Sequence, residues 1–167
     1  GEFGAFRELS GLTAVRLDST GTNFESRLNP PVLSGAFRTI NDVGEVSRSG
    51  YIFRVLFPGP GGISVGEYDL GTPVLGVEPD LGETTWCAYA WPANYGNSGN
   101  RTFFVNQTGD ITSVDDNTYG GSGALFPVGV LYGSAAFIGN TGDPDLITGR
   151  VAAGTTGRDG NRWRQVN

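Results

Sequence analysis

A chain of 167 residues can bury a single hydrophobic core without disulfides or metal ions, so we expect one domain. Its 28 glycines follow no collagen-like period and its aromatic residues are spread along the chain, which predicts many tight turns rather than disorder. All 11 basic residues are arginine, against 17 acidic residues. The net charge of −6, with no basic run, argues against nucleic acid or anionic membrane as partners.

The sequence lacks histidine, a second cysteine and methionine, and each absence limits what the chain can be. The sequence has no histidine, so proton transfer would depend on carboxylates, tyrosines and one thiol, and no nucleophile stands in an activating pattern. We therefore expect a non-enzyme with no catalytic residues. The single cysteine, Cys87, is expected to be a small buried residue, with a nucleophile or an intermolecular crosslink as alternatives. There is no methionine, which predicts that the chain is a piece of a longer one.

The first 17 residues place apolar side chains at three-residue spacing, which predicts one or two turns of helix with an apolar stripe. The stripe consists of Phe3, Phe6, Leu9 and Leu12. Gly4 and Gly11 would keep such a helix short, and the alternative is a loop whose phenylalanines cover a sheet. Further on, Pro30 and Pro31 predict extended backbone.

Residues 51–57 form the clearest predicted strand, because apolar side chains occupy both faces until Pro58 ends the run. Arg54 within it implies a partly solvated or ion-paired face. The glycine-rich stretch that follows lacks the Lys-Ser/Thr of a phosphate-binding loop. Residues 63–83 are acidic and interrupted by glycine and proline, which predicts a solvated surface loop.

Residues 84–111 hold the densest group of β-forming residues and are expected at the centre of an antiparallel sheet. An exposed loop, 92–100, would join two strands there. The sheet is expected to have about four strands, at 51–57, 85–91, 101–106 and 110–114. Residues 125–138 are predicted to be loop and short strand, and brief terminal strands are predicted at 148–151 and 162–166.

These elements predict an α+β fold in which a short or truncated N-terminal helix and long glycine-rich loops accompany the sheet. We expect a single domain over residues 1–167. Within it, residues 1–17 would be the end of the helix, 50–114 the central sheet, and 115–167 the C-terminal loops and short strands.

Two acidic clusters have the oxygen ligands that calcium prefers. They contain Asp115, Asp116, Asp143 and Asp145. A calcium site joining them is one prediction and turn-capping carboxylates are the alternative, since the EF-hand spacing is not met. No other cofactor is expected. Asn100 and Asn106 each begin an Asn-x-Thr triplet, which fits either a glycan acceptor or a strand-end cap.

Four stretches of the chain are similar to a known family. They are residues 34–51 (SGAFRTINDVGEVSRSGY), 50–62 (GYIFRVLFPGPGG), 84–111 and 156–164 (TGRDGNRWR). Together they resemble the globular part of type IV pilin-like proteins with a prepilin cleavage and methylation motif, of the planctomycete or deltaproteobacterial type. The resemblance covers about two-thirds of the chain, and the aromatic block around Trp86 and Trp91 is its most specific part.

The resemblance implies a structural subunit of a type IV pilus-like or pseudopilus filament. In that family a cleaved leader precedes an apolar N-terminal helix, which drives filament assembly and lies against a four-stranded antiparallel sheet. Neither leader nor apolar helix is in this sequence, so a trimmed pilin or a module used differently is expected. The resemblance further implies self-association through that helix, membrane contact only through it before assembly, and an extracellular or cell-surface location that faces the periplasm before assembly.

Two alternatives belong to other classes. One is a secreted β-rich binding module, for carbohydrate or surface adhesion, that uses Trp91, Tyr95 and Tyr119 on exposed loops. The weaker one is a hydrolase that depends on Asp115 and Asp116. The resemblance also gives the four aspartates added interest, because some pseudopilins carry a structural calcium in their C-terminal loops.

Overall fold

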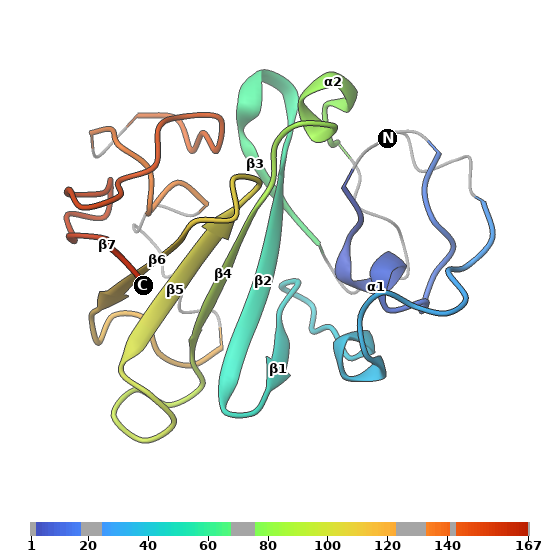
Figure 1. Ribbon diagram of the computed structural model, residues 1–167, viewed down its shortest axis with the longest axis horizontal. Helices are drawn as coiled ribbons and strands as arrows, with labels where there is room; N and C mark the ends of the chain where they lie inside the picture. The colour runs from blue at the N-terminus through green and yellow to red at the C-terminus, as the bar shows by residue number, and fades with distance from the viewer. Residues whose placement is uncertain (1–2, 18–24, 68–75, 123–132, 141–142, 167) are drawn as a thin grey trace.

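The protein was analysed as a computed structural model that describes residues 3–17, 25–67, 76–122, 133–140 and 143–166. These residues form a seven-stranded antiparallel sheet with the order β1-β2-β4-β5-β6-β7, and β3 pairs with the far end of β2 (Figure 1). The strands are β1 Val46–Arg48, β2 Tyr51–Pro58, β3 Ser64–Gly66, β4 Cys87–Pro92, β5 Arg101–Asn106, β6 Ile111–Asp115 and β7 Arg164–Gln165.

The helices that the structure describes are all short. They are α1 Phe6–Leu9, α2 Pro79–Gly82 and the 3-10 turns η1 Gly35–Arg38 and η2 Pro60–Gly62. The predicted N-terminal helix is therefore a single turn within residues 3–17. With helices of this length the fold is mostly β, and the α+β class is corrected accordingly.

The four predicted strands correspond to β2, β4, β5 and β6, and their antiparallel pairing is confirmed. The predicted number was too low, because β1, β3 and β7 have only two or three residues each and cannot show an alternating pattern. Of the predicted terminal strands, 162–166 contains β7, whereas 148–151 contributes only the isolated bridge of Val151 to Phe137. The predicted segment 125–138 lies partly outside the described residues, and its described part, 133–138, is mainly turn.

One face of the sheet is covered by the C-terminal part of the chain. Alternate residues of β4 and β5 point to this side, and their rings meet aromatic residues of the covering segments. Tyr89 and Phe104 lie 5.0 Å apart between ring centroids, Phe104 lies 5.3 Å from Phe137, and Trp163 lies 6.0 Å from Tyr89. Cys87, buried as predicted, belongs to the same cluster. We call this side the closed face.

The opposite face is covered in part by the N-terminal segment, which Figure 1 shows packed beside β2. Phe6 of α1 packs with Val46, Val55 and Phe57 of the first two strands in a second, smaller apolar cluster. Phe37 of η1 completes it, 5.3 Å from the Phe6 ring. The N-terminal segment thus combines a short helix with phenylalanines that cover a sheet, the two alternatives that the sequence left open.

Buried ion pairs hold this N-terminal segment in place. Glu67, fully buried, accepts hydrogen bonds from the backbone amides of Phe6 (2.8 Å) and Arg7 (3.0 Å) and forms a 3.2 Å ion pair with Arg7 Nε. A second buried pair joins Arg16 to Glu8 at 3.1 Å. The predicted solvated loop is therefore wrong at Glu67, because this carboxylate is the anchor for the start of α1.

The chain passes Glu67 very closely at Gly44. Gly44 has a φ of 79°, and a Cβ atom there would lie 1.4 Å from the Glu67 carbonyl oxygen. Only glycine fits this position. The Arg54 side chain, expected on a partly solvated or ion-paired face, is 2% exposed and lies beside Gly66, so the solvated alternative is wrong.

Candidate functional site

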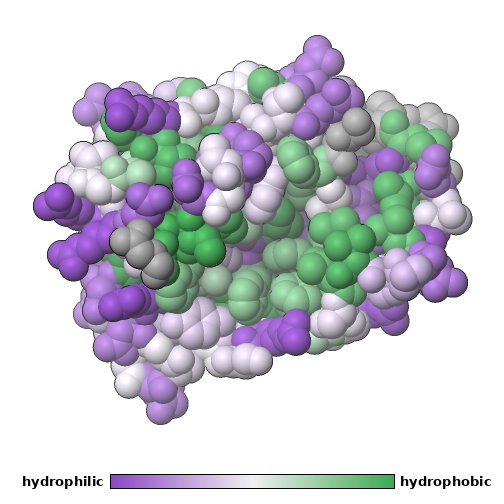
Figure 2. Space-filling model, in the orientation of Figure 1, coloured by the Kyte–Doolittle hydropathy of each residue, from purple (hydrophilic) through white to green (hydrophobic). Residues whose placement is uncertain are grey.

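An apolar strip runs across the part of the second face that the described N-terminal residues leave open. We define it by side chains of β2, β4, β5 and β6 that share one side of the sheet: Tyr51, Phe53, Ala88, Ala90, Phe103, Val105 and Ile111. They line an apolar groove of about 390 Å³. All are half-buried except Ile111, which is 44% exposed. Figure 2, which looks onto this side, shows hydrophobic residues in a band across the molecule.

The strip continues toward the start of the described chain. A second apolar cavity, of about 290 Å³, lies between the N-terminal segment and β4, and Ala88 lines both spaces. Its wall includes Phe3 and Trp86, whose rings are 5.9 Å apart. The Phe3 amide donates to the carbonyl of Gly82 at 3.2 Å, which fixes the chain at that end of the strip. The first described residue therefore lies at the cavity that adjoins the apolar strip.

The accessible lining of the strip is almost entirely apolar. Strands that are apolar on both sides are typical of sheets covered on both faces. Monomeric proteins rarely expose a contiguous apolar patch without an interaction partner for it. The sequence carried this signal in the alternation of 51–57 and 101–106, but which face would stay open depends on where the N-terminal segment packs.

The aspartates of the predicted calcium site each have protein partners. Asp115 accepts a hydrogen bond from the Tyr95 hydroxyl at 2.6 Å, and Asp116 accepts one from Asn161 Nδ2 at 2.6 Å. Asp143 caps the amide of Asn140 at 2.8 Å.

Asp145 binds a different set of groups. It accepts from the Ser64 hydroxyl and from the amides of Gly133 and Ser134, the latter at 2.8 Å. Among the described residues, no three His, Cys, Asp or Glu side chains are grouped so that they could hold a metal ion. Calcium binding stays a prediction, and a melting temperature that rises with calcium and falls again with chelator would reveal it.

The pKa shifts of these groups follow from burial and from hydrogen bonds within the fold. Burial raises the pKa of Asp116, but hydrogen bonds from Thr118 and Asn161 outweigh it and lower the pKa below its usual value. Burial raises the pKa of the Cys87 thiol well above its usual value, with Asp145 adding to the effect. A thiol held protonated in this way is a poor nucleophile. The hydroxyl of Tyr89, also buried, donates to the carbonyl of Gly133 at 2.6 Å.

The residues of the predicted binding module do not share a surface. Trp91 and Tyr119 are 0% and 2% exposed, so both are core residues and their placement on exposed loops was wrong. Trp91 lies in β4. Of the three residues, Tyr95, in the loop that follows β4, is the accessible one. Of the two glycan acceptors, Asn100 is exposed, whereas Asn106 is 5% exposed and accepts a 2.7 Å hydrogen bond from the Thr108 hydroxyl.

Comparison with known proteins finds no matching family model, no similar curated protein and no similar solved structure. Within the described ranges, no helix has the length and apolar character needed to span a bilayer. The class that the structure itself defines is a mostly-β protein built on one antiparallel sheet.

Proposed function

We propose that this chain is the globular part of a filament subunit of the type IV pilin or pseudopilin class. In this proposal an apolar helix that precedes Gly1 docks along the apolar strip and joins neighbouring subunits at the bacterial cell surface. The observation that carries the proposal is the apolar strip, which lies beside the start of the described chain.

Two further observations support this proposal. The Phe3 ring packs against Trp86 at the end of the strip, which places the first described residue close to the groove. The small side chains of Ala88 and Ala90 line the middle of the groove, where they leave room for a helix to approach the sheet. The four stretches that resemble the pilin-like family include β2, β4 and β5, three of the four strands that line this groove.

The proposal is tested with the full-length protein that the gene encodes, expressed in the organism from which the gene comes. Ala90→Glu places a charge in the middle of the apolar strip, and Ser47→Glu places the same charge on the exposed edge strand β1. We expect electron microscopy to show filaments for the wild type and for Ser47→Glu, and none for Ala90→Glu. Filaments that are unaffected by Ala90→Glu would contradict docking on the strip.

The encoding gene offers a second and independent check. A stretch of about 20 apolar residues behind a short basic leader, just upstream of Gly1, is expected from the proposal. A gene without such a stretch would overturn it.

A further inference from the structure

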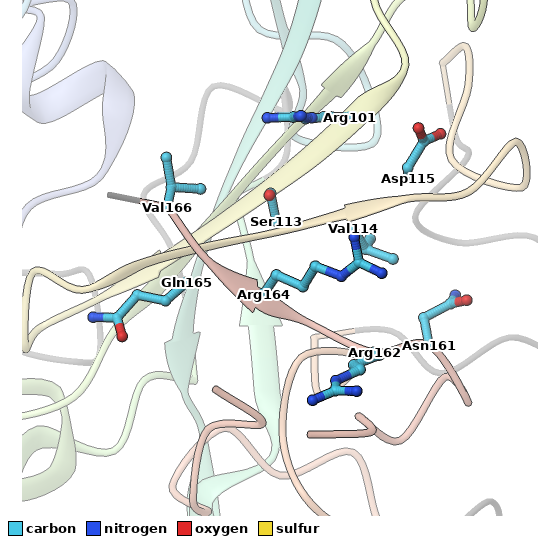
Figure 3. A pocket seen from close by; sticks show the side chains of 9 residues that line it. All are labelled: Arg101, Ser113, Val114, Asp115, Asn161, Arg162, Arg164, Gln165 and Val166. Carbon is cyan, nitrogen blue, oxygen red and sulfur yellow. The ribbon is translucent and has the colours of Figure 1, made fainter. Parts of the chain in front are cut away.

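A second groove, of about 470 Å³, lies where β5, β6 and β7 meet at the edge of the sheet. Figure 3 shows the side chains around it. It is lined by Arg101, Ser113, Val114, Asp115, Asn161, Arg162, Arg164, Gln165 and Val166. We call it the arginine groove. Its lining includes three of the 11 arginines of an otherwise acidic chain and no aromatic residue.

The arginines come together through strand register. Arg101 of β5 faces Asp115 of β6, and Arg164 of β7 faces Ser113 of β6. Residues that face each other across strands point to the same side of the sheet, so Arg101 and Arg164 flank β6 on one side. Arg162, two residues before Arg164, completes the group. The chain has no basic run, and the fold creates this cluster from residues about 60 positions apart.

The guanidinium groups of this cluster are available for a ligand. All three side chains are exposed. Arg162 Nε donates to the carbonyl of Gly154 at 3.2 Å, while no hydrogen bond or ion pair joins the side chains of Arg101 or Arg164 to another described residue. Asp115, opposite Arg101 across the strands, accepts a hydrogen bond from the Tyr95 hydroxyl, and no ion pair joins it to Arg101 among the described residues. Guanidinium groups bind carboxylate and sulfate through paired hydrogen bonds.

The rest of the lining indicates what else the ligand carries. Ser113 and Gln165 supply both donors and acceptors. Asn161 supplies its amide oxygen, because its Nδ2 donates to Asp116 and Asp159, and the Asp115 carboxylate supplies only acceptors. A sulfate ion has no hydrogen to donate to these acceptors, and the Asp115 carboxylate repels any compact anion that lies beside it. A ligand with hydroxyl groups as well as separated negative charges satisfies both kinds of partner. Duplex nucleic acid, with a charge about every 1.7 Å of its axis, is too dense for three arginines on a chain of net charge −6.

We propose that the arginine groove binds a short stretch of acidic polysaccharide, whose carboxylates pair with Arg101, Arg162 and Arg164 and whose hydroxyls bond the neutral side chains. The site is independent of the proposed filament function. Its binding can be measured on the 167-residue chain itself, so failure of one proposal leaves the other intact.

The test uses trigalacturonate as a carboxylated probe, a heparin-derived tetrasaccharide as a sulfated one, and maltotriose and inorganic phosphate as controls. Binding is measured by isothermal titration calorimetry in 0.15 M salt. At this salt concentration the Debye length is about 8 Å, so charges outside the groove contribute little to binding. We expect trigalacturonate to bind and maltotriose and phosphate not to. Tighter binding of the heparin fragment would assign sulfated glycans in place of uronates, which overturns the carboxylate pairing.

Variants locate the site. We expect Arg101→Gln with Arg162→Gln and Arg164→Gln together to weaken trigalacturonate binding by about tenfold or more. The control is Arg27→Gln, an exposed arginine of the N-terminal segment, which should bind within about twofold of the wild type. Unchanged binding in the triple variant would overturn the proposal. The proposal would also be overturned if the triple variant bound trigalacturonate normally and differed from the wild type only in self-association, measured by sedimentation. The arginines would then contact a second copy of the chain or protect the sheet edge.

Discussion

The closed face and the open face of this sheet are built from the same strands in different ways. On the closed face, alternate residues of β4 and β5 meet aromatic rings of the C-terminal segments, and hydrogen bonds of the Tyr89 and Tyr119 hydroxyls add to these ring contacts. On the open face, the described N-terminal residues are held by buried ion pairs at Glu67 and Glu8 and cover mainly the β1–β2 side. The apolar strip and the arginine groove lie on the part that remains.

The two faces are therefore expected to have different roles: the closed face stabilises the fold, and the open face binds a partner. A face filled with interlocking rings contributes most of the hydrophobic free energy, and any gap in it is costly. A face that keeps an apolar strip accessible contributes less to the folding of the domain and has surface left for a partner. Neighbouring residues of one strand should therefore respond very differently to the same substitution.

The largest effect is expected from Phe104, which is 1% exposed on the closed face. Phe104→Ala should lower the free energy of unfolding by about 4 kcal/mol, because it leaves a cavity among Tyr89, Phe137 and Trp163. The matched control is Phe103→Ala, one residue earlier on the half-buried strip, with an expected loss of about 1 kcal/mol. Denaturant unfolding measures both, and equal losses would remove the distinction between the faces.

The next effect is expected from Glu67, the anchor of the N-terminal segment. Glu67→Gln should lower the free energy of unfolding by about 3 kcal/mol, because one amide oxygen cannot accept from both backbone amides and pair with Arg7. The exposed Glu25 supplies the control, and Glu25→Gln should change stability by less than about 0.5 kcal/mol. Similar values for the two variants would show that the ion pair is not an anchor.

The same carboxyl group gives a pH dependence with a defined sign. Burial raises the pKa of Glu67 above 4.5, more than the hydrogen bonds from Arg7 and Phe6 lower it. The folded state therefore holds a proton more tightly than the unfolded state, and this group's contribution falls as pH rises from 4.5 through the folded pKa. The stability difference between wild type and Glu67→Gln should be larger at the acidic end of this range. An unchanged difference would contradict the raised pKa.

A smaller effect is expected at Tyr119, whose hydroxyl donates to Asp159 at 2.6 Å on the closed side. Tyr119→Phe should cost about 1 kcal/mol, while Tyr51→Phe on the open strip should cost less than about 0.5 kcal/mol. Burial raises the pKa of Tyr119 above its usual value of 10.0, with Asp159 adding to the effect. Stability should therefore be lost above about pH 10, where tyrosines of the unfolded state ionise, and less steeply in Tyr119→Phe. Identical alkaline profiles would argue against this.

The last comparison uses thiol chemistry and leaves stability nearly unchanged. Cys87 points to the closed face and is 0% exposed, whereas Ala88, the next residue, lies on the apolar strip. Ellman's reagent should leave the native wild type unlabelled and should label one thiol of Ala88→Cys. Labelling of Cys87 in the native protein would mean that the closed face opens readily.

The regular strands were predictable because their signal is local. Alternation in residues 51–57 and the aromatic runs on either side of residues 92–100 predicted β2, β4, β5 and their antiparallel pairing with β6. The buried state of Cys87 followed from its apolar neighbours. The short strands β1 and β3 were missed because three residues carry no pattern, and their pairing depends on the strand β2 that they join.

What the sequence by itself determined is where the chain turns and which runs are extended, because glycine, proline and alternation act over a few residues. Only the tertiary structure decided which aromatic residues belong to the core, and it buries Trp91 and Tyr119. It also decided that Glu67 anchors the N-terminal segment and is not a surface charge. It also decided that Arg101 and Arg164 lie on one groove and that one face stays partly open. These features depend on contacts between residues far apart in the chain, and such contacts leave no local pattern to read.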